Sequence, residues 1–396
     1  MLKMERNKKK KIGVDFDDTL APCTQVILDM AQSEFGFNPP LSIEEVSGWL
    51  PLGSRVDVAL KYFQDPKFFG SVKPYEGAKE FIHELSKECE IFFITAVPPE
   101  AMGYRAEVLM REFPEVPKDH YILTSAKDII DLDILLDDAP HNLFATTAKY
   151  PICMRRPWNS NITGMLAVNN YDEALTLIRQ INNATKDVVF DKDVNHVFAL
   201  VGTSGSGKTT LAQELCKRND FEQPISYTDR KKRNENDKYN FVTTEEFMGL
   251  KAKGDIFEST KYAGNNYGSS LSAIEKVLND GKNAVIPVDM CGAMGIKSKF
   301  PNAITVFIDR DKRSLLKAII SRNTSDDEKA SRIIGMDAEA KNAQLCDYII
   351  NNYGSVNDMV EDFLKILAWE KSWFSPTLLL FYRFFNIIKS FFCIFF

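Results

Sequence analysis

Short apolar stretches alternate with helical patterns along most of the chain. Stretches with the length and apolarity of buried strands cover residues 11–14, 90–96, 133–139 and 196–201. Patterns with the spacing of amphipathic helices lie between the first three, for example over residues 77–87 and 99–113. Strands that alternate with helices favour a parallel sheet, in which ligands bind at the carboxyl ends of the strands. The pattern therefore predicts an α/β protein with parallel sheets.

Polar side chains stand where these predicted strands end. The first strand runs into Asp15 and Asp17, the second ends at Thr95, and the third ends at Asp137 and Asp138. Carboxylates on one face of a strand end repel each other, which costs stability unless a cation lies among them. A carboxylate can also attack phosphorus and form an aspartyl-phosphate, which splits hydrolysis into two easier steps. These residues therefore indicate a site for a cation.

The fourth apolar stretch leads into a glycine-rich loop, residues 202–209, with the pattern G-x-x-x-x-G-K-T, and a helical pattern follows over residues 210–216. The glycines let backbone N–H groups surround phosphate oxygens, and the N-terminus of the helix adds partial positive charge. We expect Lys208 to reach the β- and γ-phosphates of ATP and the Thr209 hydroxyl to hold Mg²⁺. The residues expected to bind ATP are Gly202, Ser204, Gly205, Ser206, Gly207, Lys208, Thr209 and Thr210.

Composition adds limits to this picture. A chain of 396 residues, with 44% hydrophobic and 26% charged residues, suits two globular domains of about 150–200 residues each. The net charge of −6 argues against general nucleic-acid binding, which favours a basic face. Cysteines are dispersed without a C-x-x-C pair, which indicates reduced thiols in a cytoplasmic protein. Residues 1–10 are basic and read as a disordered tail.

The residues at the first three strand ends resemble the four motifs of the haloacid dehalogenase superfamily, and more closely those of its 5'(3')-deoxyribonucleotidases. The matching elements are the run Asp15-x-Asp17-x-Thr19, Thr95, Lys127 and the pair Asp137-Asp138. The likeness implies a Rossmann-like phosphatase domain over residues 11–185, with a small helical cap over about residues 21–74.

The same resemblance implies a role for each motif residue. Asp15 would be the nucleophile, and Asp17 would protonate the leaving oxygen and then activate water. Mg²⁺ would be held by Asp15, the Asp17 carbonyl and Asp137 or Asp138. Thr95 and Lys127 would bind the phosphoryl oxygens. The cap is rich in aromatic residues, most of which we expect to form its core.

The order of elements after residue 195 resembles guanylate kinase. The most specific elements are S-x-T-x-R-x-x-R at residues 226–233 and G-N-x-Y-G-S at residues 264–269. The resemblance implies a P-loop kinase domain over residues 196–368, after a linker at residues 186–195. Residues matching the positions that read guanine are Ser226, Glu258, Ser269 and Asp289. Residues matching those that hold the monophosphate are Arg230, Arg233, Tyr239 and Tyr267.

Arg322 and Arg332 fall where that family has its lid arginines, which neutralise the transferring phosphoryl group and exclude water. The sequence also departs from the family. Pro287 replaces a usual acidic residue, and Asp229 and Lys232 replace the usual Thr and Pro. These changes surround the acceptor site and put guanine selectivity in doubt more than kinase activity.

The last segment, residues 369–396, is apolar with a polar stripe. It fits an amphipathic helix in the plane of a membrane better than a membrane span, and a partner-binding helix or a non-native read-through end fits it equally. Such a helix would allow peripheral contact with a membrane or with a partner.

These features predict a bifunctional enzyme of nucleotide metabolism. A Mg²⁺-dependent 5'-nucleotidase acting on (deoxy)nucleoside monophosphates would be fused to a kinase that uses ATP to phosphorylate a GMP-like monophosphate. One alternative is a polynucleotide kinase-phosphatase that heals nucleic-acid ends, which the acidic net charge and the monophosphate pocket disfavour. The other is a guanylate kinase-like interaction scaffold, which the intact phosphate loop disfavours.

Overall fold

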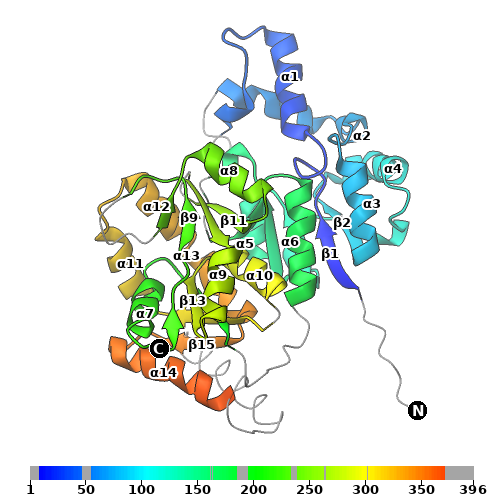
Figure 1. The fold of residues 1–396 in the computed structure, drawn as a ribbon. Coiled ribbons are helices and arrows are strands. Elements are labelled where there is room, and N and C mark those ends of the chain that lie inside the picture. Colours follow the sequence, from blue (N-terminus) through cyan, green and yellow to red (C-terminus); the bar gives the residue numbers. More distant parts are fainter. Residues whose placement is uncertain are drawn as a thin grey trace, which may run out of the picture.

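A computed structural model of the chain (Figure 1) describes residues 9–46, 55–160, 162, 164–184, 195–232, 239–262, 265–300 and 302–370. The N-terminal domain is built on a parallel sheet in the order β3-β2-β1-β4-β5-β6. Its strands are β1 (Lys10–Val14), β2 (Cys89–Thr95), β3 (Tyr121–Leu123), β4 (Ile134–Asp137), β5 (Tyr150–Met154) and β6 (Leu166–Val168). All four residues of β4 are buried, which explains why this strand reads as a continuous apolar run.

Helices connect these strands, as parallel pairing requires. They are α3 (Ala78–Glu88), α4 (Met102–Glu112), α5 (Pro140–Ala145) and α6 (Tyr171–Ala184), with short 3₁₀ segments η3 (Pro99–Ala101), η4 (Lys118–His120), η5 (Lys127–Ile129) and η6 (Pro157–Asn159). Between β1 and α3 lie α1 (Cys23–Phe35), η1 (Ile43–Glu45), η2 (Arg55–Gln64) and α2 (Phe68–Ser71). Phe68 and Phe69 are buried there and meet edge to face, so these two aromatic rings belong to the core of the cap segment.

The C-terminal domain has a five-stranded parallel sheet in the order β15-β14-β7-β13-β8. Its strands are β7 (Val197–Val201), β8 (Phe221–Glu222), β13 (Asn283–Pro287), β14 (Ile304–Asp309) and β15 (Tyr348–Asn351). The central strand β7 is buried along its whole length. It therefore delivers the glycine loop to the carboxyl edge of a rigid sheet.

A second, mixed sheet in the order β10-β9-β12-β11 belongs to the same domain. Its strands are β9 (Ser226–Thr228), β10 (Tyr239–Phe241), β11 (Ile256–Tyr262) and β12 (Asn265–Ser270). The helices are α7 (Lys208–Leu215), α8 (Thr244–Ala252), α9 (Leu271–Asn279), α10 (Met290–Lys299), α11 (Lys312–Ile320), α12 (Asp326–Ile334), α13 (Met336–Lys341) and α14 (Val356–Glu370), with η7 (Asn342–Leu345) after α13. The short polar strands of this second sheet were not predicted from the sequence.

The two domains share one hydrophobic core. Helix α6 of the first domain packs against α10 of the second, and the two helices lie side by side in Figure 1. Buried Ala174 and Ile178 on α6 belong to the same apolar cluster as Ala293 and Met294 on α10. Burial of this kind removes apolar surface from water in both domains at once, so the interface stabilises each half of the chain.

Within the described part of the chain, no helix has both the length and the apolarity needed to cross a bilayer. Most of the C-terminal segment for which an amphipathic helix is predicted, from residue 371 on, lies outside the described residues, as does nearly all of the predicted linker at residues 186–195 and of the basic tail.

Candidate active sites

Three buried carboxylates meet at the carboxyl edge of the N-terminal sheet. Asp15 follows β1, Asp137 ends β4, and Asp138 comes directly after it. Because β1 and β4 are neighbours in a parallel sheet, their ends lie together. One oxygen of each carboxylate lies within 4.8 Å of the others, and the three residues are at most 4% exposed. Oxygen ligands gathered in this way are the donor set that Mg²⁺ prefers.

Lys127 lies between two of these carboxylates. Its Nζ is 2.9 Å from Asp15 Oδ1 and 2.7 Å from Asp137 Oδ2, and the lysine is buried. Burial raises the pKa of Asp15 to about 7, although the charge of Lys127 opposes that shift. Burial also raises the pKa of Asp138 well above its usual value. Repulsion by the neighbouring carboxylate of Asp137 adds to both shifts. A divalent cation among the three carboxylates would offset this repulsion.

Thr95 and Asp17 are joined by a residue that the sequence analysis missed. Thr95 ends β2 and is fully buried. Arg105, on α4, donates from Nη1 to Thr95 Oγ1 over 2.9 Å and from Nη2 to Asp17 Oδ1 over 2.6 Å. The sequence did hold a signal for it, because Arg105 interrupts an apolar helical stripe formed by Ala101, Val108 and Leu109.

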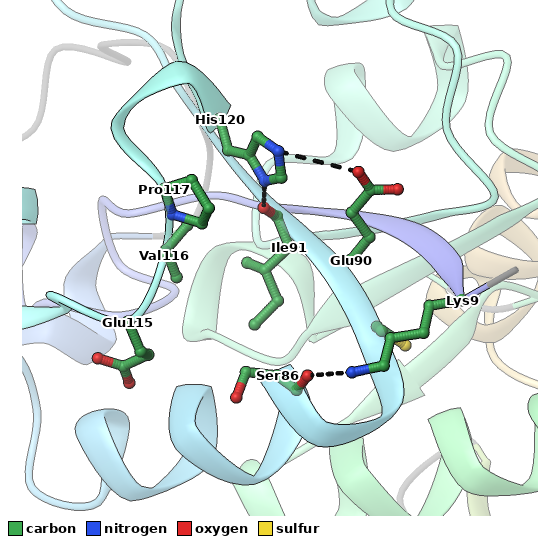
Figure 2. A pocket seen from close by; sticks show the side chains of 9 residues that line it. Lys9, Ser86, Glu90, Ile91, Glu115, Val116, Pro117 and His120 are labelled. Atoms are coloured by element: carbon green, nitrogen blue, oxygen red, sulfur yellow. Dashed lines mark hydrogen bonds and ion pairs between the residues drawn. The ribbon is translucent and has the colours of Figure 1, made fainter.

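A separate cavity of about 290 Å³ opens at the other end of the same strands (Figure 2). It is lined by residues before β1, at the start of β2 and before β3, so it lies at the amino ends of the strands. Polar groups of its lining form hydrogen bonds with one another: Lys9 Nζ donates to Ser86 O over 2.7 Å, and His120 Nδ1 donates to Ile91 O over 2.8 Å. We assign no chemistry to this cavity.

The glycine loop of the second domain has the backbone that a phosphate cradle requires. Gly202, Gly205 and Gly207 all have positive φ angles, of 151°, 90° and 107°. Asn352 Nδ2 donates to Ser206 O over 2.7 Å and Arg310 Nη1 donates to Gly205 O over 2.8 Å. These two side chains fix the positions of the Ser206 and Gly205 carbonyls and so help to hold the conformation of the loop.

Lys208 starts helix α7 behind this loop, followed by Thr209 and Thr210, which are exposed at its first turn. The Lys208 ammonium donates to the carbonyls of Gly202 and Thr203. Burial lowers the pKa of Lys208, Arg322 and Arg332 act in the same direction, and Glu339 opposes them.

Of the two predicted lid arginines, Arg332 contacts the loop directly, whereas Arg322, which follows α11, acts on Lys208 through its charge. Arg332, on α12, is buried and donates from Nη1 to Ser204 Oγ over 2.6 Å. Its Nη2 forms an ion pair of 2.7 Å with Glu328. The Ser204 N–H donates to Glu339 Oε2 over 2.8 Å, a contact across 135 positions that the sequence analysis did not predict. Burial raises the pKa of this glutamate, against the charge of Lys208.

The predicted acceptor residues gather on the mixed sheet. The Arg230 guanidinium lies over the Tyr239 ring at 5.1 Å, and the Tyr239 ring meets the Tyr267 ring edge to face at 5.9 Å. Ser226 begins β9, and Ser269 is buried on β12. An arginine beside two phenols suits a dianionic phosphate.

Two further aspartates near the predicted acceptor site hold secondary structure together: Asp289, which was predicted to read guanine, and Asp229, which departs from the family pattern. Asp289 caps α10, where its Oδ1 accepts from the Gly292 N–H over 2.8 Å, so this carboxylate is partly committed to the helix. Asp229 accepts from the Asn266 N–H over 2.7 Å and from Thr244 Oγ1 over 3.1 Å. Its carboxylate thereby anchors β12 to α8. Arg233 and the side chain of Glu258 lie outside the described residues.

The geometry thus defines a chain with a phosphatase-type domain and a P-loop kinase-type domain. Residues 9–184 match the family model described as 5' nucleotidase, deoxy (pyrimidine), cytosolic type C protein, and residues 197–370 match that of guanylate kinase. Guanylate kinase of Prochlorococcus marinus subsp. pastoris is 31% identical over 182 residues, which cover 44% of this chain and 98% of the relative. Guanylate kinase of Clostridium perfringens strain 13 is 34% identical over 179 residues, covering 44% of this chain and 82% of the relative.

Solved structures resemble each half. A guanylate kinase from Anaplasma phagocytophilum is 24% identical, covers 45% of this chain and 87% of its own, and has a TM-score of 0.36. A haloacid dehalogenase-like hydrolase from Xanthomonas campestris is 13% identical, covers 43% of this chain and 95% of its own, and has a TM-score of 0.28. By its sequence relatives, the C-terminal half of the chain belongs to the guanylate kinase family. Its N-terminal half matches the model of the deoxy (pyrimidine) 5' nucleotidase family over residues 9–184.

Proposed function

We propose that the chain is a bifunctional enzyme in which a nucleoside monophosphate phosphatase is fused to an ATP-dependent nucleoside monophosphate kinase. The observation that carries this proposal is the presence of two separate phosphate-chemistry sites in one chain. One is the carboxylate cluster of Asp15, Asp137 and Asp138, and the other is the phosphate loop that holds Lys208. Each site stands at the carboxyl edge of its own sheet.

In the phosphatase, an Asp15 oxygen forms a bond to phosphorus while the bond to the leaving oxygen breaks. Asp17 gives that oxygen a proton, then takes one from the water that hydrolyses the aspartyl-phosphate. Lys127 and Thr95 bind the phosphoryl oxygens. Asp15, the Asp17 carbonyl and Asp137 or Asp138 would hold Mg²⁺, which would supply charge that offsets the repulsion between nucleophile and phosphate.

In the kinase, the loop from Gly202 to Thr209 binds the phosphates of ATP, with Mg²⁺ on the Thr209 hydroxyl. Arg230, Tyr239 and Tyr267 hold the phosphate of the acceptor, as their shared position on the mixed sheet supports. Arg322 and Arg332 neutralise the transferring group. The acceptor is GMP-like, a proposal that rests on the guanylate kinase relatives.

Two opposed activities in one chain are useful only if their substrates differ. We therefore expect the phosphatase to dephosphorylate one nucleoside monophosphate, while the kinase converts a monophosphate with a different base or sugar to its diphosphate. Measuring phosphate release and ADP formation across a panel of nucleoside monophosphates tests this. Identical preferences in the two domains would contradict it.

The residues that carry each activity are tested with two variants of the full chain. Asp15→Asn removes the nucleophile and is expected to abolish phosphate release while ADP formation stays within about twofold. Lys208→Ala is expected to lower ADP formation by about 10²- to 10³-fold, the size of a lost electrostatic stabiliser, with phosphate release unchanged. A variant that lost both activities while remaining folded would refute the assignment of separate sites.

A further inference from the structure

Arg105 is an arginine with no exposed surface, an unusual place for a charged residue. Burying a guanidinium is costly unless it is paired and its N–H groups are satisfied. Arg105 lies on the apolar face of α4, where an aliphatic residue would pack at no such cost. Its position therefore calls for an explanation in the groups that it contacts.

Those groups come from three segments that are far apart in the sequence. Nη2 donates to Asp17 Oδ1 over 2.6 Å, Nη1 donates to Thr95 Oγ1 over 2.9 Å, and Nε points to the carbonyl of Phe69 at 3.4 Å. The guanidinium also covers the Phe16 ring at 4.1 Å. Arg105 thus links the loop after β1, the end of β2 and the cap helix α2 within the phosphatase site.

We propose that Arg105 is a positioning residue of the phosphatase, which fixes the atom on Asp17 and the proton on Thr95 that take part in the reaction. This inference rests on the proposed phosphatase function. Its charge also lies near Asp15, whose carboxylate is among the groups that stabilise the charged guanidinium.

On Asp17, one oxygen is fully engaged. Oδ1 accepts from Arg105 Nη2 and also from Cys23 Sγ over 2.7 Å, whereas the described residues place no hydrogen bond on Oδ2. Oδ2 is therefore the oxygen that delivers a proton to the leaving oxygen as the bond from Asp15 to phosphorus forms. It takes a proton back from water as the aspartyl-phosphate bond breaks. Arg105 prevents the carboxylate from rotating away from this geometry.

On Thr95, the hydroxyl oxygen is an acceptor for Arg105. A hydroxyl has one proton to donate and two lone pairs to accept with. Because Nη1 supplies the hydrogen bond on one lone pair, the Thr95 proton is directed to another acceptor. A phosphoryl oxygen held beside Lys127 would be that acceptor. One guanidinium therefore orients both the acid/base and a phosphate-binding group, which suits its planar fork of donors.

The test compares two substrates that differ only in the leaving atom. One is a nucleoside 5'-monophosphate that the wild type hydrolyses, and the other is its analogue with sulfur as the bridging 5' atom. A thiolate leaves with little help from a general acid, because a thiol is far more acidic than an alcohol. The measured quantity is kcat/KM, because it reports phosphoryl transfer to Asp15 and not the later hydrolysis step.

For Arg105→Met we expect kcat/KM to fall by about 100-fold with the oxygen substrate, the order of effect for a displaced general acid, and by less than about tenfold with the sulfur substrate. Asp17→Asn is expected to show the same selective loss. Arg105→Lys keeps the charge but cannot serve Asp17 and Thr95 together, so an intermediate loss is expected. Arg111→Met is the matched control, because Arg111 lies on the same helix but is exposed and paired with Glu112.

Kinase activity of the same chains reports whether each variant is folded. Equal losses with both substrates in Arg105→Met and Arg105→Lys, with kinase activity intact, would overturn the positioning role. A different result would count against the proposed function instead: wild type that hydrolyses neither substrate, or Asp15→Asn that still hydrolyses both.

Discussion

Gly202, the first glycine of the phosphate loop, lies where a side chain has no room. A Cβ atom built there would be 2.6 Å from the backbone oxygen of Ile308 and 2.7 Å from Ser206 Oγ, at a φ of +151°. Backbone of the neighbouring strand cannot yield as a flexible side chain does. The conformation of the loop therefore depends on this glycine, and so does the carbonyl that receives the Lys208 ammonium.

Gly202→Ala is expected to weaken binding of ADP by at least tenfold, because the loop must shift away from β14. Calorimetric titration of the full chain with ADP measures this. The control is Gly249→Ala in the middle of α8, where no atom lies within 4 Å of the added Cβ. That change is expected to raise the free energy of unfolding by about 0.5–1 kcal/mol and to leave ADP binding unchanged. Unaltered ADP affinity in Gly202→Ala would show that the conformation of the phosphate loop does not depend on this glycine.

Helix α10 and strands β14 and β15 are held together by one carboxylate. Asp347 accepts from Lys297 Nζ at 2.5 and 2.7 Å, and from Thr305 N and Oγ1 at 2.9 and 2.8 Å. Lys297 on α10 is buried. Removal of its partner leaves an uncompensated charge in the interior, which is far more costly than loss of a surface ion pair.

We therefore expect Asp347→Ala to lower the free energy of unfolding by about 3–5 kcal/mol, as measured by urea denaturation. The pair Lys297→Met with Asp347→Ala should recover most of that loss, because it removes both charges. Glu222→Ala serves as the comparison, since its ion pair with Lys282 is 2.6 Å long but well exposed, and exposed pairs contribute little to stability. Similar losses in both single variants would mean that burial of Lys297 is not decisive.

At the scale of elements, long apolar strands were predictable and short polar ones were not. Strands β1, β4 and β7 stand out in the sequence because burial on both faces demands continuous apolar runs. Strands β9 and β10 have three residues each, and their pairing depends on tertiary contacts rather than on pattern. The mixed sheet was therefore missed, although the resemblance to guanylate kinase had already singled out Ser226 and Tyr239 on it.

The residues of the two sites also fall into those that were predictable from the sequence and those that were not. Motif residues such as Asp15 and Lys208 were predictable because each follows a recognisable strand, and their catalytic roles stay predictions. Arg105 and Glu339 were missed because the partners that explain them, Asp17 and Ser204, are distant in sequence. In a single sequence, a buried charged residue is visible only as one charged position within the apolar stripe of a helix. The sequence does not reveal which distant group satisfies the charge.

The two domains are not joined by the linker alone, because buried residues of both belong to one hydrophobic cluster. Beside the packing of α6 on α10, Lys341 at the end of α13 donates to the carbonyl of Phe144 on α5, and Asn342 Nδ2 donates to the carbonyl of Gly164 over 3.3 Å. Domains move independently unless their interface is large and apolar. The continuous buried cluster across α6 and α10 shows that this interface is apolar.

We therefore expect the described parts of both domains to unfold in one cooperative transition. A ligand of the phosphate loop then stabilises the phosphatase as well. At 100 times its dissociation constant, adenylyl imidodiphosphate, a non-hydrolysable ATP analogue, should add about 2.7 kcal/mol to the free energy of unfolding. Scanning calorimetry of the full chain would show one peak that moves upward. The temperature at which phosphatase activity is lost should rise with it, and neither should move in Lys208→Ala. Two peaks of which only one responds would show that the shared core does not couple the domains, since a ligand acts only on the unit that unfolds with its site.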